Sequence, residues 1–241
     1  MKKIIGLALC TLFAVDVVSA AKLPEDLSYT IYVKGSPAGK AEIKVSYEGD
    51  TITFESTTSV DYGAFKMNAR CRTAADAKTG IMRSFRWDGE KNGQKYSGEL
   101  AYDGKVAKGI VRVDDSVVEE AKSPPAHPVI AFEDYIVEHE ILLAHVHAAA
   151  GETGLTGSLL LPSAFSFVSV GMRAASEQII ESNIKEAVCR KLLVEMQGGS
   201  PWAIYFDDQR GLPVYLAFPS VGTEIFLDEF FGDEPVSRYT E

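Results

Sequence analysis

An alternation of apolar and polar side chains, repeated every two residues, runs through most of the chain and limits its fold more than any other feature. Leu27, Tyr29, Ile31 and Val33 are one example, typical of a β-strand with one buried face. Turn-forming residues interrupt the alternation at intervals of about ten residues, the spacing of a meandering antiparallel sheet. The sequence therefore predicts a mainly β protein.

Alternating segments occur both before residue 123 and after residue 154, and no linker separates the two groups. Together they predict about 11–13 strands in one curled antiparallel sheet, either an open half-barrel or a barrel-like fold. Sheets of this size commonly form one domain. We therefore assign residues 21–231 to a single β half-barrel domain and the polar residues 232–241 to a flexible tail.

Residues 1–20 have the pattern of a cleaved secretory signal peptide. Lys2 and Lys3 precede an apolar run at 4–15, and small residues at 18–20 resemble a cleavage site. The apolar run is shorter than the roughly 20 residues that cross a bilayer. We expect an exported protein that begins near Ala21.

The stretch 128–151 departs from the alternation and has helical periodicity. Its apolar residues recur on one face, namely Phe132, Ile136, Leu143 and Val146. Its polar residues fall on the opposite face, namely Asp134, Glu138 and His145. The pattern predicts a helix at about 128–149 that starts with Pro128 and covers the sheet as a lid or plug. Acidic residues interrupt the stretch, so we do not expect it to span a membrane.

Cys71 and Cys189 are the two cysteines that follow the predicted signal peptide. In an oxidising compartment they could form one disulfide. Both lie in apolar strand-like segments, so two separate buried thiols are the alternative. No spacing of cysteine and histidine suggests a zinc site, and we expect neither a metal nor a cofactor.

A curled sheet encloses a concavity that a single helix is too small to fill, which suggests a site for a lipid or another apolar ligand. The candidate ligand-binding residues are Phe65, Met67, Phe85, Trp87, Phe132, Ile136, His139, Leu143 and Trp202. Each of them is also compatible with an ordinary core position. His139 is either a contact for a ligand head group or a hydrogen-bonded histidine beneath the helix.

Signatures of catalysis and of nucleic-acid binding are missing from the sequence. No Gly-x-Ser-x-Gly motif or phosphate-binding glycine loop occurs, and His139-Glu140 lacks the second histidine of a zinc-protease helix. The formal net charge of −10 is a poor match to nucleic acid. We predict a protein that is not an enzyme and does not bind nucleic acid.

Three segments carry a family resemblance: Tyr32-Val33-x-Gly35-x-x-x-Gly39-x-Ala41, Phe132-Glu133-Asp134-Tyr135, and Trp202-x-x-Tyr205-Phe206-Asp207-x-x-x-Gly211-Leu212-Pro213-Val214 followed by Pro219. In them the chain resembles uncharacterised Gram-negative envelope proteins known only as domains of unknown function. Such proteins look similar in architecture to periplasmic lipoprotein-sorting carriers, whose open β half-barrel holds acyl chains. The resemblance implies a periplasmic location and a carrier or binding function.

The leading hypothesis is a periplasmic protein that binds or carries a lipid or acyl chain in the concavity of its sheet. The alternative comes from another functional class. It is a non-enzymatic assembly or scaffold protein of the cell envelope that holds a protein partner through its sheet edge or its acidic surface.

Overall fold

The computed structural model describes residues 22–151, 154–207 and 210–232. The predicted signal peptide at 1–20 lies outside these residues, as do residues 233–241 of the predicted tail. The described strands all belong to one sheet of 15 strands.

The first layer of the sheet holds eight consecutive strands: β1 Asp26–Val33, β2 Ser36–Glu48, β3 Thr51–Tyr62, β4 Phe65–Asp76, β5 Met82–Lys91, β6 Gln94–Tyr102, β7 Ala107–Val113 and β8 Ser116–Lys122. The second layer holds the rest: β9 Val129–Ala131, β10 Gly154–Leu161, β11 Ser166–Glu181, β12 Glu186–Met196, β13 Trp202–Asp207, β14 Leu212–Phe218 and β15 Thr223–Leu227. The helical elements are α1 Val137–Ala150, α2 Asp228–Phe231 and the short 3-10 turns η1 Pro162–Ala164 and η2 Pro219–Val221.

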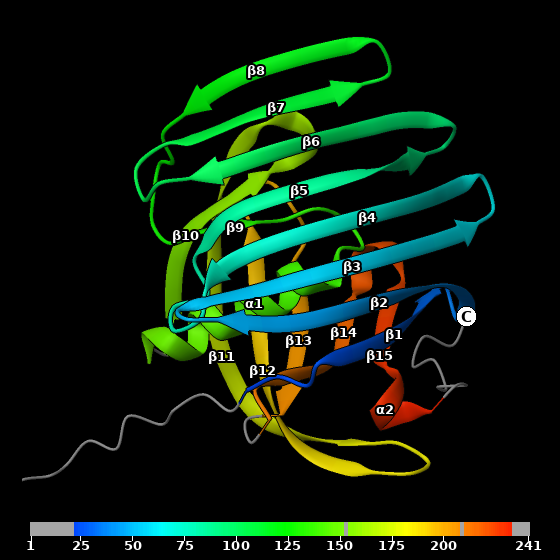
Figure 1. Cartoon of the computed structure of the whole chain (residues 1–241). Helices are drawn as coiled ribbons and strands as arrows, with labels where there is room; N and C mark the ends of the chain where they lie inside the picture. Colours follow the sequence, from blue (N-terminus) through cyan, green and yellow to red (C-terminus); the bar gives the residue numbers. More distant parts are fainter. Residues whose placement is uncertain (1–21, 152–153, 208–209, 233–241) are drawn as a thin grey trace, which may run out of the picture.

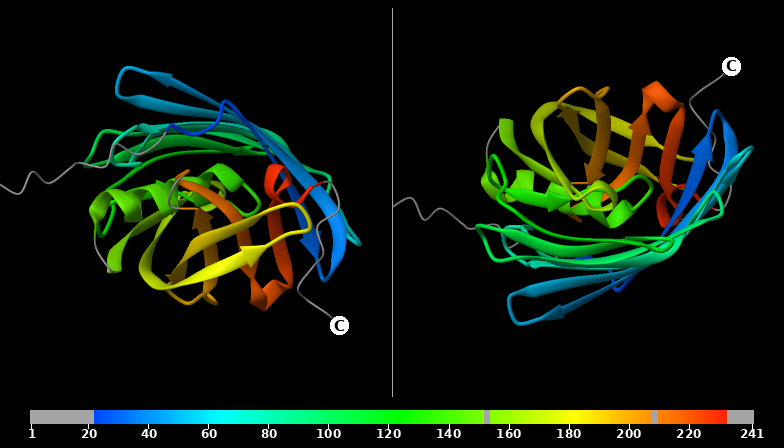
Figure 2. Two further views of the ribbon diagram at one scale, coloured as in Figure 1. Left: turned by 90° about the horizontal axis from the view of Figure 1, so that it is seen from below. Right: turned by 90° about the horizontal axis from the view of Figure 1, so that it is seen from above.

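The strand order is β8-β7-β6-β5-β4-β3-β2-β1-β15-β14-β13-β12-β11-β10-β9. Pairing of β1 with β15 joins the two layers, and every neighbouring pair is antiparallel except β9 with β10. The sheet curls over on itself without closing into a barrel (Figures 1 and 2). The predicted fold class, one curled antiparallel sheet with one long helix near the middle of the chain, is confirmed.

The described residues form 15 strands, two more than the upper end of the predicted range. β8 is polar and lacks a buried face, so its sequence resembles a charged loop. β9 consists of three buried apolar residues inside the stretch that has helical periodicity. A short strand buried on both faces shows no alternation by which it could be recognised.

The predicted start of the helix at Pro128 is wrong, because α1 begins at Val137. Residues 129–131 form β9, which pairs in parallel with β10. Tyr135, just before the helix, has a φ of 64°, which a helix cannot contain. The predicted end is confirmed: Gly151 closes the helix with a φ of 63°.

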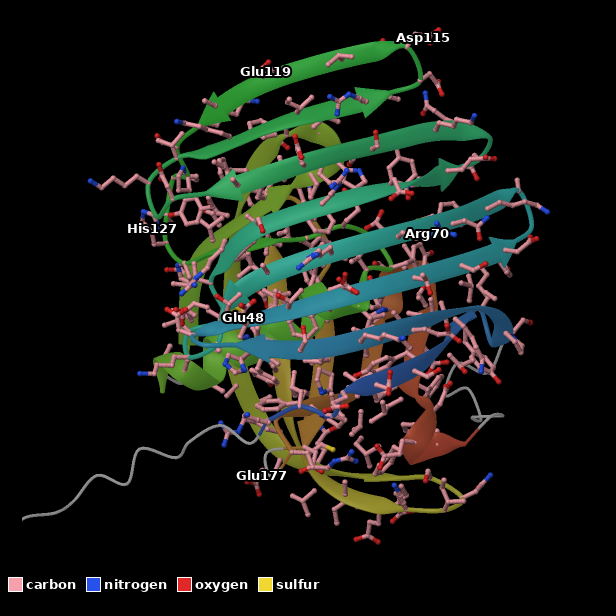
Figure 3. The ribbon with its side chains drawn as sticks, viewed as in Figure 1. Glu48, Arg70, Asp115, Glu119, His127 and Glu177 are labelled. Carbon is pink, nitrogen blue, oxygen red and sulfur yellow. The ribbon has the colours of Figure 1, made fainter. Side chains whose placement is uncertain are left out.

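The prediction that the helix covers the sheet as a lid, with one face exposed to solvent, is also wrong. α1 lies between the two layers (Figure 2), and ten of its fourteen residues are buried. Glu138, predicted to face solvent, is fully buried. His145 is half-buried, and its Nε2 lies 3.0 Å from the Ala77 carbonyl oxygen. Charged side chains exposed to solvent instead cover the outer face of the first layer, among them Arg70 (Figure 3).

Leu142 lies on the same side of α1 as Glu138, the side that a lid would expose to solvent. Its side chain is 1% exposed, as expected for a helix inside the core. We expect Leu142→Ala to lower the free energy of unfolding by about 2–5 kcal/mol, since it leaves a cavity in a packed core. Ile184→Ala, at a position 60% exposed, is the control and should change it by less than about 0.5 kcal/mol. Urea denaturation measures both. An effect of Leu142→Ala as small as that of the control would contradict the central position of α1.

Candidate functional site

The first turn of α1 carries two buried glutamates that reach opposite layers. Glu138 accepts a hydrogen bond from the Ser56 hydroxyl on β3, with 2.7 Å between the oxygens. Glu140 accepts one from the Trp202 indole N–H on β13, with an N–O distance of 3.1 Å. The helix N-terminus, with its free N–H groups, favours acidic residues in this turn. The two carboxyl groups therefore connect the helix to both layers of the sheet.

Burial changes the protonation of both glutamates. Loss of hydration raises the pKa of Glu138 to about 7, although the Ser56 hydrogen bond acts in the opposite direction. Burial likewise raises the pKa of Glu140 to about 8, against the effect of the Trp202 hydrogen bond. At neutral pH most Glu140 side chains are therefore protonated and uncharged.

His139, between the two glutamates, is fully buried and points to a third wall. Its Nδ1 accepts a hydrogen bond from the Glu133 N–H at 3.1 Å, and its ring lies edge-on to Phe85 with centroids 4.8 Å apart. Burial lowers the pKa of His139 to about 3, so the ring is neutral. The ring thus has one hydrogen bond, through Nδ1, whereas its buried Nε2 has no partner among the described residues.

Five of the nine predicted ligand-binding residues form two packed groups of rings. Phe85 stacks on Trp87 with centroids 5.0 Å apart, next to His139. Phe132 lies 5.2 Å from Trp202, measured between ring centroids. The remaining members are Met67, Ile136 and Leu143, which are buried, and Phe65, which is partly buried. Eight of the nine residues are thus buried side chains.

A small pocket remains where α1 begins, and we call it the α1 pocket. Its volume is about 110 Å³. It is lined by Phe132, Asp134, Tyr135, Glu140, Phe218, Val221, Thr223 and Ile225. Drug-sized ligands occupy pockets of about 300–1,000 Å³, whereas a cavity of about 150 Å³ holds benzene. The α1 pocket is smaller than that cavity, so it has room for the end of a chain.

Three polar residues line the α1 pocket beside its apolar walls, namely Asp134, Glu140 and Thr223. Glu140 is 4% exposed. Thr223 is 2% exposed, and its Oγ1, which protein atoms enclose, has no hydrogen-bond partner among the described residues. An unpaired buried hydroxyl costs about 1–3 kcal/mol. A few polar groups in an apolar pocket are typical of ligand sites.

Tyr135, in the wall of the pocket, adds backbone strain to the site. Its φ of 64° is unfavourable for a bulky residue. A hydrogen bond from the Thr58 hydroxyl to the Tyr135 carbonyl oxygen, at 3.3 Å, helps to hold this conformation. The Tyr135 ring packs against Phe65 with centroids 5.4 Å apart. Such strain is concentrated at functional sites, which supports the choice of this pocket.

Sequence reasoning placed Phe132 at a ligand site but missed the rest of this pocket. Tyr135, Glu140 and Thr223 were assigned no ligand contact. The positive φ of Tyr135 and the unpaired state of Thr223 arise from three-dimensional contacts, so no sequence pattern indicates them.

Cys71 on β4 and Cys189 on β12 are buried and form no disulfide with each other. Burial raises the pKa of the Cys71 thiol well above its usual value, which makes it unreactive. Of the two alternatives from the sequence, the structure therefore has separate buried thiols.

Within the described ranges no group of three or more metal-binding side chains is placed to hold an ion. Neither helix in this part of the chain is long and apolar enough to cross a membrane.

Stability should depend on pH through Glu140. Its folded pKa is raised, so the stabilising effect of its proton is complete at low pH and is lost as pH rises toward about 8. We expect the free energy of unfolding to fall between pH 7 and 8, by up to about 1.4 kcal/mol from this group. Glu140→Gln should remove that part of the decline.

Urea denaturation at pH 7, 7.5 and 8 measures this slope, and Glu119→Gln, at an exposed position on β8, is the control. The control should retain the slope of the wild-type protein. A Glu140→Gln variant with an unchanged slope would mean that Glu140 titrates alike in the folded and unfolded chains.

No model of a protein family matches the chain, and no curated protein matches it. Among solved structures, the chain is similar to a crystal structure of a DUF1089 family protein from Pseudomonas aeruginosa, with 15% sequence identity and a TM-score of 0.43. The similarity covers 75% of this chain and 90% of that chain. Similarity at this level carries no conclusion about function, and the relation to envelope proteins and lipoprotein carriers stays a prediction.

Proposed function

We propose that the protein binds a lipid or another apolar ligand without catalysing a reaction, and that the α1 pocket holds one end of that ligand. The observation that carries this proposal is a pocket with apolar walls in an otherwise packed interior. Phe132, Phe218 and Ile225 supply those walls. Val221, at the edge of the pocket, is 56% exposed, which gives a ligand access to the apolar surface.

The packing around α1 favours a ligand held by one end over a ligand enclosed along its whole length. An acyl chain needs a far larger volume than about 110 Å³. The rest of such a ligand would extend from the pocket past Val221. This mode of binding is narrower than the carrier expected from the sequence.

Arrangement of the ionisable groups supports a binding role over an enzymatic one. Glu138, His139 and Glu140 point to three different walls, and catalysis by these groups would need them to converge on one reacting atom. The export pattern of residues 1–20 supports a periplasmic location for this binding protein. Cell fractionation tests that location.

Val221→Arg should weaken ligand binding because it puts a charge at the apolar entrance of the pocket. Ile184→Arg is a matched control, since Ile184 is 60% exposed and lies in the β11–β12 turn. We expect 1-decanol to bind the wild-type protein and the Ile184→Arg variant alike, and to bind Val221→Arg at least about tenfold more weakly. Calorimetric titration measures the affinities.

Mass spectrometry of organic extracts from natively purified protein would identify the ligand that is carried. The absence of saturable binding by the wild-type protein, or equal binding by Val221→Arg, would overturn the proposed function.

A second candidate function is the scaffold role, and the edge strand β8 favours it. β8 pairs only with β7 among the described strands, and Val117 and Val118 are 61% and 45% exposed. An exposed edge can accept a strand from a partner protein. Glu119 and Glu120 argue against this role, because charged residues commonly protect edges from pairing.

Cross-linking in intact cells tests the scaffold role. The scaffold predicts a stoichiometric cross-linked partner that is lost in a Val118→Lys variant. A carrier predicts no such partner.

A further inference from the structure

We propose that the β11–β12 hairpin docks its exposed end into a partner protein whose contact surface has two apolar hollows with a lysine or arginine between them. The exposed end comprises residues 177–188, and we call it the hairpin tip. The inference does not use the α1 pocket and goes beyond the proposed function, which needs no protein partner.

The hairpin tip projects from the body of the sheet (Figure 1). β10 pairs with β11 only as far as Arg173, and β13 pairs with β12 only from Cys189 onward. Within the tip, β11 and β12 therefore have no other partner among the described strands. An isolated two-stranded ribbon is marginally stable in water, so the tip must be held by contacts with the rest of the protein.

Contacts on its inner face hold the hairpin tip in place. Ile180 is buried, and the Ser182 hydroxyl donates a hydrogen bond to the Phe230 carbonyl oxygen, with 2.7 Å between the oxygens. Lys185 forms an ion pair with Glu229 at 3.1 Å. The tip is thus fixed before it meets a partner, which lowers the entropy cost of docking.

The outer face and the turn of the hairpin tip carry exposed apolar side chains. Ile179 and Val188 lie directly opposite each other on the two strands and are more than half exposed, as is Ile184 in the turn. These are three of the six large apolar side chains that are exposed in the described structure. Half of the exposed apolar groups therefore gather on one projecting element, which marks it as an interaction site.

An acidic pair separates the apolar residue of the turn from the apolar pair on the strands. Glu181 and Glu186 are both exposed and lie directly opposite each other, and like charges in this arrangement destabilise a sheet. Within the described chain neither carboxylate has an ion-pair partner, because Lys185 already holds another carboxylate. The charged pair farther from the turn, Glu177 with Arg190, has opposite charges. A cation supplied by a partner would remove the repulsion between Glu181 and Glu186.

The order of these groups favours a protein over a lipid surface. Glu181 and Glu186 lie nearer the turn than Ile179 and Val188, so the two carboxylates would enter a membrane before that apolar pair does. Burial of a carboxylate without a cation is costly. A protein can instead place a lysine or arginine opposite the acidic pair and an apolar surface on each side of it.

A second copy of the chain is a poor partner for the hairpin tip. Contact between two tips related by twofold symmetry would bring their acidic pairs near each other. The tip has 12 residues, 177–188, whereas a stable interface uses about 20–30 residues on each side. We therefore expect a short-lived contact with a different protein that carries the opposite charge.

The experiment places a photoreactive residue in the turn, as Ile184→p-benzoylphenylalanine, in native cells that make the full chain. Irradiation should link the chain to one protein. The double variant Glu181→Lys, Glu186→Lys should lower the yield of this adduct at least about fivefold, because the reversed charges repel the partner's cation. The partner, once identified from the adduct by mass spectrometry and purified, should bind the wild-type chain in calorimetry, and more weakly as salt rises.

Glu42→Lys with Glu48→Lys is the matched control, because it makes the same change in net charge at exposed positions on β2 in the other layer. This control should keep the adduct. Val118→Lys should keep it too, which separates the contact from a partner held by the edge strand β8. Urea denaturation verifies that each variant is folded.

Three results in these cells and titrations would overturn the inference: no adduct, an adduct that survives reversal of Glu181 and Glu186, or a purified partner that does not bind. A fourth is flotation of the wild-type chain with vesicles of phosphatidylcholine and phosphatidylglycerol that Ile184→Arg abolishes, because the tip would then dock on lipid. Binding of 1-decanol is independent of all these outcomes, so the proposed function is judged separately.

Discussion

Burial of α1 between two layers of one sheet is the constraint on which the rest of the structure depends. Each layer has an apolar inner face that must be covered, and the helix covers part of both. The first turn fixes its position, because Glu138 bonds to Ser56 on one layer and Glu140 bonds to Trp202 on the other. The helix is thus a shared core element and carries buried ionisable groups that a lid would expose.

The α1 pocket follows from the way the chain enters this helix. The segment between β9 and α1 turns sharply at Tyr135, which adopts a left-handed backbone conformation. That turn leaves a gap between Phe132 and the β14–β15 connection. Thr223 lines the gap, and its enclosed hydroxyl finds no partner in the described structure. A strained residue and an unsatisfied one therefore meet at the same small space.

The alternating pattern was sufficient to predict the sheet, because one face of most strands is buried and the other is solvated. The pattern failed at three elements. β9 is buried on both faces, β8 is polar, and α1 is surrounded by apolar layers, so its polar residues do not mark a solvent side. Helical spacing alone indicated that a helix exists and where it ends, but not which side faces solvent.

The candidate site was less predictable than the fold. Aromatic residues such as Phe132 and Trp202 were recognised as ligand candidates, although most of that set packs as core. The features noted at the α1 pocket are a backbone angle and a missing hydrogen bond, and neither is confined to it. Both depend on contacts between segments distant in sequence, which periodicity and composition do not encode.

A crystal of the protein pressurised with xenon tests the central claim most directly, because xenon binds dry apolar cavities and needs no knowledge of the natural ligand. The account predicts a xenon atom in the α1 pocket, between Phe132 and Phe218, without displacement of α1. Density for ordered side chains that fill this space, with no xenon there, would contradict it.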